Sequence, residues 1–301
     1  MIGRRGILAN AFDGSLARVA AGGFTIVELV VTLTVSSVVI AFAAMFISGP
    51  VAGFNDQARR AQLVDSADAA LKRMSRDVRR ALPNSVRVGN AGGIAALELL
   101  GTVDGARYRE KPPGSPDQRL NLAAADDSFN VIGPFTQIGK PFSSTNHFLA
   151  IYNVGVPGAD AYELANVMTP AGTQIDIASD VFSSEDRVLL APAFRFRFAS
   201  PTQRVFLVDG PISYICDSIA GTLTRYTGYS IAQNHSDRDS AAELLAAGAA
   251  SSLVADRVTA CAISYAPGTS ERAGLVTFEI SVGAAGETVS LLSQVHVDNA
   301  P

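Results

Sequence analysis

The stretch GFTIVELVVTLTVSSVVIAFAAMFI, residues 23–47, decides the fold of this chain. From Phe24 onward it supplies 24 residues, and Glu28 is the only charged side chain among them. At about 20 residues per crossing, this length spans a bilayer with some tilt. A carboxylate at membrane depth is costly unless it has a partner. We therefore expect a transmembrane helix, residues 24–48, that does more than anchor the chain.

The residues before this stretch differ from an ordinary signal peptide, in which small residues follow the apolar core. Here the small residues AAGG, at 20–23, come before the apolar segment. Cleavage at that point leaves the apolar helix on the mature chain. Residues 1–23 also carry three arginines against one acid. By the positive-inside rule, this leader stays in the cytoplasm and the residues after the span are exported.

The junction between Gly23 and Phe24 resembles the class III signal of type IV prepilins. The resemblance implies that a prepilin peptidase cuts after Gly23, that Phe24 becomes a methylated N-terminus, and that Glu28 pairs with the N-terminal amine of a neighbouring subunit. In a bundle of low dielectric constant, the attraction between two opposite charges offsets the desolvation free energy that each charge costs when it is buried. The chain departs from the family in having no basic residue directly before Gly23, since Arg18 is the nearest. The alternative is a generic signal anchor whose Glu28 reaches the membrane interface.

An amphipathic helix is expected to follow the span, over residues 49–82. Proline removes a backbone donor and clashes with the preceding turn, so we expect a kink or local melting at Gly49 and Pro50. Apolar residues then return at the spacing of one helix face. They are Leu63, Val64, Ala67, Ala70, Leu71, Met74, Val78, Ala81 and Leu82.

The charges of this helix differ from those of the rest of the exported chain. Residues 56–82 carry seven basic and four acidic side chains, whereas residues 83–301 carry 14 basic and 22 acidic ones. The basic face can meet an acidic surface of its own head or of a neighbouring subunit, or remain solvated. A nucleic-acid partner is not expected, because this helix has no aromatic residue and the formal net charge of the chain is −4.

Residues 83–301 are expected to form a β-rich head. Turn-forming residues separate short runs of β-favouring residues, and about 220 residues suffice for one domain. Asp104-Gly105 predicts a hairpin between Leu97–Val103 and Ala106–Glu110. Further strands are expected at Phe148–Val154, Phe194–Phe198, Val205–Val208, Ile212–Cys216, Leu223–Tyr229, Val258–Tyr265, Leu275–Val282 and Thr288–Val297, with a short helix near Ser240–Ala247.

Alternation of apolar and polar residues indicates how these strands are arranged. Phe194–Phe198 and Val276–Val282 both alternate with a period of two, which is typical of antiparallel sheet with one buried face. The fold class is therefore α+β, with a long N-terminal helix packed on a mainly antiparallel, β-rich head.

The chain has two cysteines, Cys216 and Cys261, both in the part expected to be exported. An even pair in an oxidising compartment favours a disulfide, and closing a loop of this size stabilises a domain by roughly 4 kcal/mol in the chain-entropy model. Two separate buried thiols are the alternative. No Cys-x-x-Cys spacing indicates a metal site.

No constellation of residues indicates an enzyme. His147, His235 and His296 lie far apart in the sequence, and common hydrolase, metalloprotease and phosphate-binding motifs are missing. The polar tract His235, Ser236, Asp237 and Asp239 resembles a cation site only loosely, and such a tract is more often a loop. We expect no catalytic residue, metal or cofactor.

Longer segments resemble the MshO family of minor prepilins in mannose-sensitive haemagglutinin (MSHA) pilus systems. In the helical part these are GPV at 49–51, ARRAQLVD at 58–65 and RDVRRALPNSVR at 76–87. In the head they are GPISYICD at 210–217, GTLTRY at 221–226, DRVTAC at 256–261 and QVHVDNAP at 294–301. The resemblance spans nearly the whole mature chain. It implies a low-abundance subunit that helps to initiate or complete a pilus, related in architecture to the large minor pseudopilins of type II secretion.

We therefore expect a minor pilin. Its partners would be other major and minor pilins through the N-terminal helix, a prepilin peptidase and methylase, and the inner-membrane assembly platform. Before assembly we expect it in the inner membrane with its head in the periplasm, and afterwards in a pilus at the cell surface. The alternatives are a minor pseudopilin of a type II secretion system and a tip adhesin, although no ligand motif supports adhesion directly.

Overall fold

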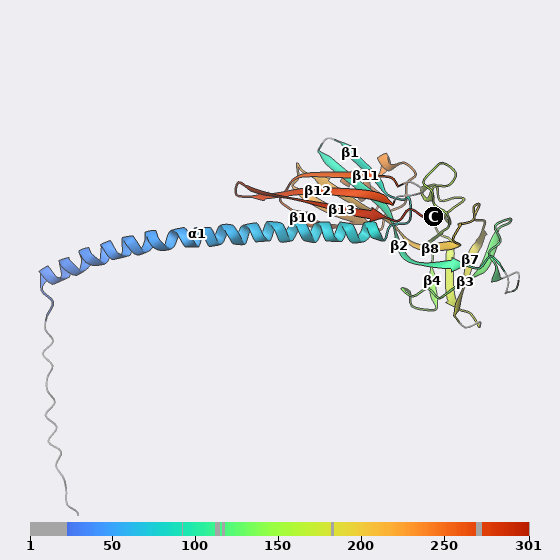
Figure 1. Ribbon diagram of the computed structural model, residues 1–301, viewed down its shortest axis with the longest axis horizontal. Helices are drawn as coiled ribbons and strands as arrows, with labels where there is room; N and C mark the ends of the chain where they lie inside the picture. The colour runs from blue at the N-terminus through green and yellow to red at the C-terminus, as the bar shows by residue number, and fades with distance from the viewer. Residues whose placement is uncertain are drawn as a thin grey trace, which may run out of the picture. The chain divides into compact units, whose positions relative to one another are not determined.

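The computed structural model describes residues 23–91, 93–111, 115, 118–181, 184–268 and 273–300. The chain combines one long helix, α1 (Ile26–Arg79), with a head built mainly from antiparallel strands, so it has the predicted α+β fold (Figure 1). Apart from Gly23, the expected leader lies outside the described residues. Two compact units divide between Gln57 and Ala58, inside α1. The expected domain bounds, which fall elsewhere, stay predictions.

In the first unit, α1 is helical through Gly49 and Pro50. Local melting is therefore not found at these two residues, and the kink stays a prediction. A proline inside a helix removes one hydrogen bond, and the many remaining bonds of a long helix keep it continuous.

The second unit, residues 58–301, contains two sheets. The larger follows the order β10-β9-β8-β2-β3-β7-β6-β4, with β1 paired to β2 and β5 paired to β8. Its strands are β1 (Arg87–Ala91), β2 (Ile94–Tyr108), β3 (Asp126–Ile132), β4 (Phe142–Ser144), β5 (Phe148–Ala150), β6 (Gln174–Ser179), β7 (Glu185–Phe194), β8 (Arg204–Asp217), β9 (Thr222–Thr227) and β10 (Ala250–Asp256). The smaller sheet is β11 (Val258–Ala266), β12 (Gly274–Ala284) and β13 (Glu287–Val297) in sequence order. Short helical turns are η2 (Ala161–Glu163), η3 (His235–Asp237) and α2 (Ala241–Ala246).

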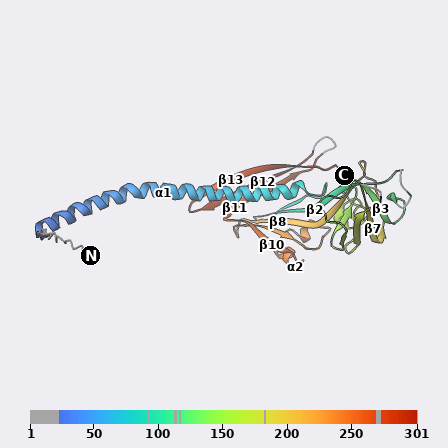
Figure 2. The ribbon, with the colours of Figure 1, turned by 90° about the horizontal axis from the view of Figure 1, so that it is seen from below.

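The second half of α1, residues 58–79, lies alongside β12 and β13 in both views (Figures 1 and 2). It buries the face that the apolar spacing predicts, which consists of Leu63, Ala67, Ala70, Leu71, Met74 and Val78. These side chains share one core, the helix core, with Phe278 and Ile280 of β12, Val295 of β13 and Leu97 of β2. Both sheets therefore contribute apolar residues to the core that holds this half of α1.

The long strands β2 and β8 each take part in two cores. Leu97 of β2 and Tyr214 of β8 belong to the helix core. Tyr108, at the other end of β2, and Leu207 of β8 belong to a second core with β3, β6 and β7. Because the same two strands run through both cores, they join the two parts of the head.

The hairpin expected at Asp104-Gly105 is wrong. β2 continues through these residues, because Asp104 pairs with Leu207 and Gly105 with Phe206 of β8. Register shifts on both sides of Thr102 place an irregularity in the strand rather than a reversal of the chain. The Asp104 carboxylate accepts backbone N–H groups of Thr136 and Gln137, so it holds a distant loop.

Candidate functional site

The residues of the predicted cleavage junction lie at the start of α1. Gly23, Phe24 and Thr25 precede the helix, which begins at Ile26. The Glu28 backbone N–H donates to the Thr25 hydroxyl at 3.2 Å, and the Leu29 N–H donates to the Thr25 carbonyl at 3.0 Å. Thr25 thus caps the helix by satisfying a free backbone donor of the first turn.

Apolar periodicity does not predict this cap, although the sequence contains another signal for it. Thr25 and Glu28 have the Thr-x-x-Glu spacing of a capping box. A carboxylate in the first turn also interacts favourably with the positive end of the helix dipole. In the structure the capping contact uses the backbone N–H of Glu28, while its carboxylate lies in the first turn of the helix. Experiments must therefore separate a contribution of Glu28 to the helix start from the assembly role expected from the resemblance.

The Glu28 carboxylate is exposed and has no ion-pair partner among the residues that the structure describes. Phe24, the expected new N-terminus, is 72% exposed. Phe24 therefore lies just before α1, and Glu28 lies in its first turn. Cleavage after Gly23, methylation of Phe24 and charge pairing by Glu28 stay predictions.

The first half of α1 presents apolar side chains all round. Its exposed large apolar side chains are those of Ile26, Val27, Leu29, Val30, Val31, Leu33, Val35, Val38, Val39, Ile40, Phe42, Met45, Phe46, Ile47, Val51 and Phe54. In length and composition α1 qualifies as a candidate membrane span. A helix that is apolar on every side needs an apolar environment around it, such as lipid or other helices.

Several hydroxyl groups of this half donate to backbone carbonyls of the same helix. The Thr32 hydroxyl donates to the Glu28 carbonyl at 2.8 Å, and the Thr34 hydroxyl donates to the Val30 carbonyl at 3.0 Å. The Ser37 hydroxyl donates to the Thr34 carbonyl at 2.8 Å. Because a polar group without a partner is costly in lipid, these internal bonds suit the segment to a bilayer.

An ionic cluster attaches the second half of α1 to the larger sheet. Asp77 accepts the Tyr214 hydroxyl and the Arg225 Nε, both at 2.7 Å. Burial, together with the Asp77 charge, raises the pKa of Tyr214 well above its usual range. Tyr214 therefore remains a neutral hydrogen-bond donor. The cluster fixes one turn of α1 against β8 and β9.

The predicted disulfide is confirmed between Cys216 and Cys261, whose Cα atoms are 6.5 Å apart. Cys216 lies on β8 of the larger sheet and Cys261 on β11 of the smaller one. The bond therefore links the two sheets at the helix core, to which Cys216 belongs and against which Cys261 packs.

A buried polar cluster in the head was not found from the sequence. Glu98 is fully buried, and its carboxylate accepts Arg87 Nη2 at 2.6 Å and the Tyr229 hydroxyl at 3.1 Å. The Arg87 guanidinium also lies 3.3 Å from the centre of the Tyr162 ring. Burial raises the pKa of Glu98 although Arg87 opposes the shift. Arg87 and Glu98 face each other on the paired strands β1 and β2, whereas Tyr162 and Tyr229 come from distant segments that no local spacing could reveal.

The polar tract at His235 forms the entry to a helix. η3 spans His235–Asp237, and Ser240 then caps α2. The Ser240 hydroxyl accepts the Glu243 N–H at 3.3 Å, while the Glu243 carboxylate accepts the Ser240 N–H at 3.2 Å. Within the described part of the chain, no group of three or more potential metal ligands lies together.

The three histidines belong to separate elements. His147 accompanies Ser144 and Asp209 beside β5, whereas His296 lies on β13. His235 packs next to Gly89 of β1, and burial together with the Arg87 charge lowers its pKa.

Comparison of the chain with protein-family models, with curated proteins and with solved structures finds no match. The structure itself defines the class of the protein, which has a long, apolar N-terminal helix and a β-rich head that contains a disulfide. This arrangement is compatible with a pilin-like fold.

Proposed function

We propose that this protein is a pilin-like subunit that assembles into a filament through the first half of α1. The observation that carries the proposal is the exposed apolar part of α1, residues 26–47, which begins two residues after Phe24 and has Glu28 as its single charged side chain. The second half of the same helix is built into the core of a disulfide-bonded head. A helix of this kind suits a protein that moves from a membrane into a bundle of similar helices.

The proposed assembly begins with cleavage of the peptide bond after Gly23. The new amine of Phe24 is methylated by the processing enzyme and remains positively charged. In the bundle, Glu28 of one subunit accepts the N-terminal amine of its neighbour. Both charges are removed from water, and each then compensates the other.

The narrower proposal is a minor pilin of the MSHA type, and it rests on the segments that resemble the MshO family, such as residues 76–87 and 210–217. A minor pseudopilin of a type II secretion system has the same helix and differs in its partners, so the genes beside this one distinguish the two. A tip adhesin is the remaining alternative. If adhesion is the main role, deletion of head loops abolishes attachment while pili remain.

The decisive variants separate the charge of Glu28 from its role at the helix start. Glu28→Gln keeps a side chain suited to the capping box and removes the charge, and Glu28→Ala removes both. Thr25→Ala removes the cap and keeps the charge. We expect both Glu28 variants to be processed and inserted, but to enter filaments at least about tenfold less well, because the neighbour's buried amine loses its partner.

Thr25→Ala serves as the matched control and should enter filaments nearly as well as the unaltered chain. The readout is the amount of each variant in sheared filaments relative to the membrane fraction. Normal incorporation of Glu28→Gln contradicts the proposed charge pairing.

A further inference from the structure

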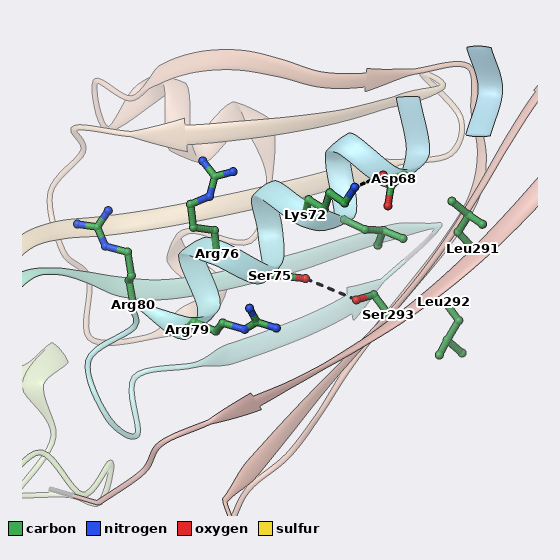
Figure 3. A pocket seen from close by; sticks show the side chains of 10 residues that line it. Asp68, Lys72, Ser75, Arg76, Arg79, Arg80, Leu291, Leu292 and Ser293 are labelled. Atoms are coloured by element: carbon green, nitrogen blue, oxygen red, sulfur yellow. Dashed lines mark hydrogen bonds and ion pairs between the residues drawn. The ribbon is translucent and has the colours of Figure 1, made fainter. Parts of the chain in front are cut away.

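A groove of about 600 Å³ lies between the second half of α1 and the strand β13 (Figure 3). On the helix side it is lined by Lys72, Arg76, Arg79 and Arg80. On the sheet side it is lined by Leu291, Leu292 and Ser293, and the hydroxyls of Ser75 and Ser293 lie 3.5 Å apart between the two walls. We call this feature the basic groove.

The basic groove has positive charge that the head itself does not neutralise. Its one acid, Asp68, is 2.6 Å from Lys72 and is therefore already paired. The Arg80 guanidinium donates to the Thr102 carbonyl at 3.2 Å. Arg76 and Arg79 are exposed and form no ion pair with any residue in the described ranges. An acidic partner is therefore the chemical complement of this surface.

The sheet side of the groove is an open strand edge. β13 is the last strand of its sheet and pairs with β12 over its whole length, from Glu287 to Val297. In the described part of the chain, its other side carries no backbone hydrogen bond to a third strand. Leu292 is 64% exposed on this strand. An edge of this length can pair with an added strand of another chain.

We propose that the basic groove binds an extended, acidic segment of a neighbouring protein subunit, which pairs with the edge of β13 and places its carboxylates against Arg76 and Arg79. The inference goes beyond the proposed function because it gives the chemistry of a partner on the head. Leu291 and Leu292 favour a protein segment with an apolar side chain. A single-stranded nucleic acid would instead need aromatic stacking residues, and the residues lining the groove include none.

The test uses the full chain in detergent and a fluorescent peptide of about ten residues that alternates glutamate and valine, a length typical of a strand. We expect saturable binding that weakens with salt, measured by fluorescence anisotropy. Arg76→Glu should weaken binding about fivefold or more, because it replaces attraction by repulsion at the groove. Arg73→Glu is the matched control, because it makes the same charge change at an exposed residue of the same helix that does not line the groove. It should change affinity less than about twofold.

Two further probes test the extended geometry and the class of ligand. The same peptide with N-methylated backbone amides keeps its charge but cannot pair with β13, so it should bind about fivefold less tightly. A single-stranded DNA oligonucleotide of equal charge should bind more weakly than the peptide. No peptide binding, equal effects of Arg73→Glu and Arg76→Glu, or tighter binding of the DNA would each overturn the proposal. Thermal melting of both variants establishes that the head remains folded.

Discussion

The two halves of α1 differ in what surrounds their apolar side chains. Met45, in the first half, is 77% exposed, whereas Met74, in the second half, is 3% exposed. The first half is apolar on all sides, but the second half is apolar on one face and charged on the other. A single continuous helix therefore serves two environments.

The two halves therefore obtain their stability from different surroundings. Burying a large apolar side chain contributes about 1.5–3 kcal/mol, and the second half gains this from the helix core. The first half has no such cover among the described residues and must gain it from lipid or from other helices. Changes in the two halves should accordingly have separate consequences, for head stability and for assembly.

The largest expected effect on head stability is that of removing the disulfide. The double variant Cys216→Ala, Cys261→Ala should lower the free energy of unfolding of the head by roughly 4 kcal/mol, because the bond closes a loop with a sequence separation of 45 residues. Denaturant unfolding of the full chain in detergent measures this change. Hydrogen exchange in residues 26–54 should stay the same, and a loss of protection there would contradict the separation of the two halves.

The same substitution in each half of α1 should have different consequences for the head. Met74→Ala should lower the free energy of unfolding of the head by about 3 kcal/mol, because it leaves a cavity in the helix core. Met45→Ala, its matched control, should leave head stability unchanged. Thermal unfolding of the two variants checks the prediction, and equal melting temperatures would show that the second half of α1 does not support the head.

The smallest expected effect is on the pH dependence of the free energy of unfolding, and it involves Glu98. Glu98 is buried in the head beside Arg87, whereas Glu28 is exposed and has no ion-pair partner among the described residues. Burial raises the pKa of Glu98 above 4.5, so the folded head retains a proton that the unfolded chain has released. Its contribution to stability is present below pH 4.5 and is lost as the pH rises through the folded-state pKa. The free energy of unfolding of Glu98→Gln should lack this decline.

Urea unfolding at a series of pH values, compared with the unaltered chain, measures the difference. Glu28→Gln is the control, because Glu28 lies outside the unit that contains the head. An identical pH dependence for Glu98→Gln and the unaltered chain would show that Glu98 does not titrate as described.

Periodicity allowed both halves of α1 to be predicted, because unbroken apolar sequence and three-and-four spacing are local signals. The same holds for β12 and β13. At Phe194–Phe198 the alternation correctly predicts the buried Phe196 between exposed arginines, but β7 ends at Phe194. Beyond that point, the Arg197 N–H donates to the Asn166 carbonyl rather than to a neighbouring strand.

Pairing between distant segments could not be predicted in the same way. Asp104-Gly105 has turn-forming residues, yet the long pairing of β2 with β8 overrides that preference. The contact of Glu98 with Tyr229 and the basic groove likewise depend on segments that only the tertiary fold brings together. The cap formed by Thr25 is different, since its spacing from Glu28 was visible in the sequence.

Mass spectrometry of the N-terminus of the protein, isolated from its native membrane, tests the proposed processing at Gly23 most directly. We predict a mature chain that starts at Phe24 and carries a methyl group on its amine. A chain that retains Met1, or that starts at another residue, would contradict the proposal that Glu28 meets a processed N-terminus.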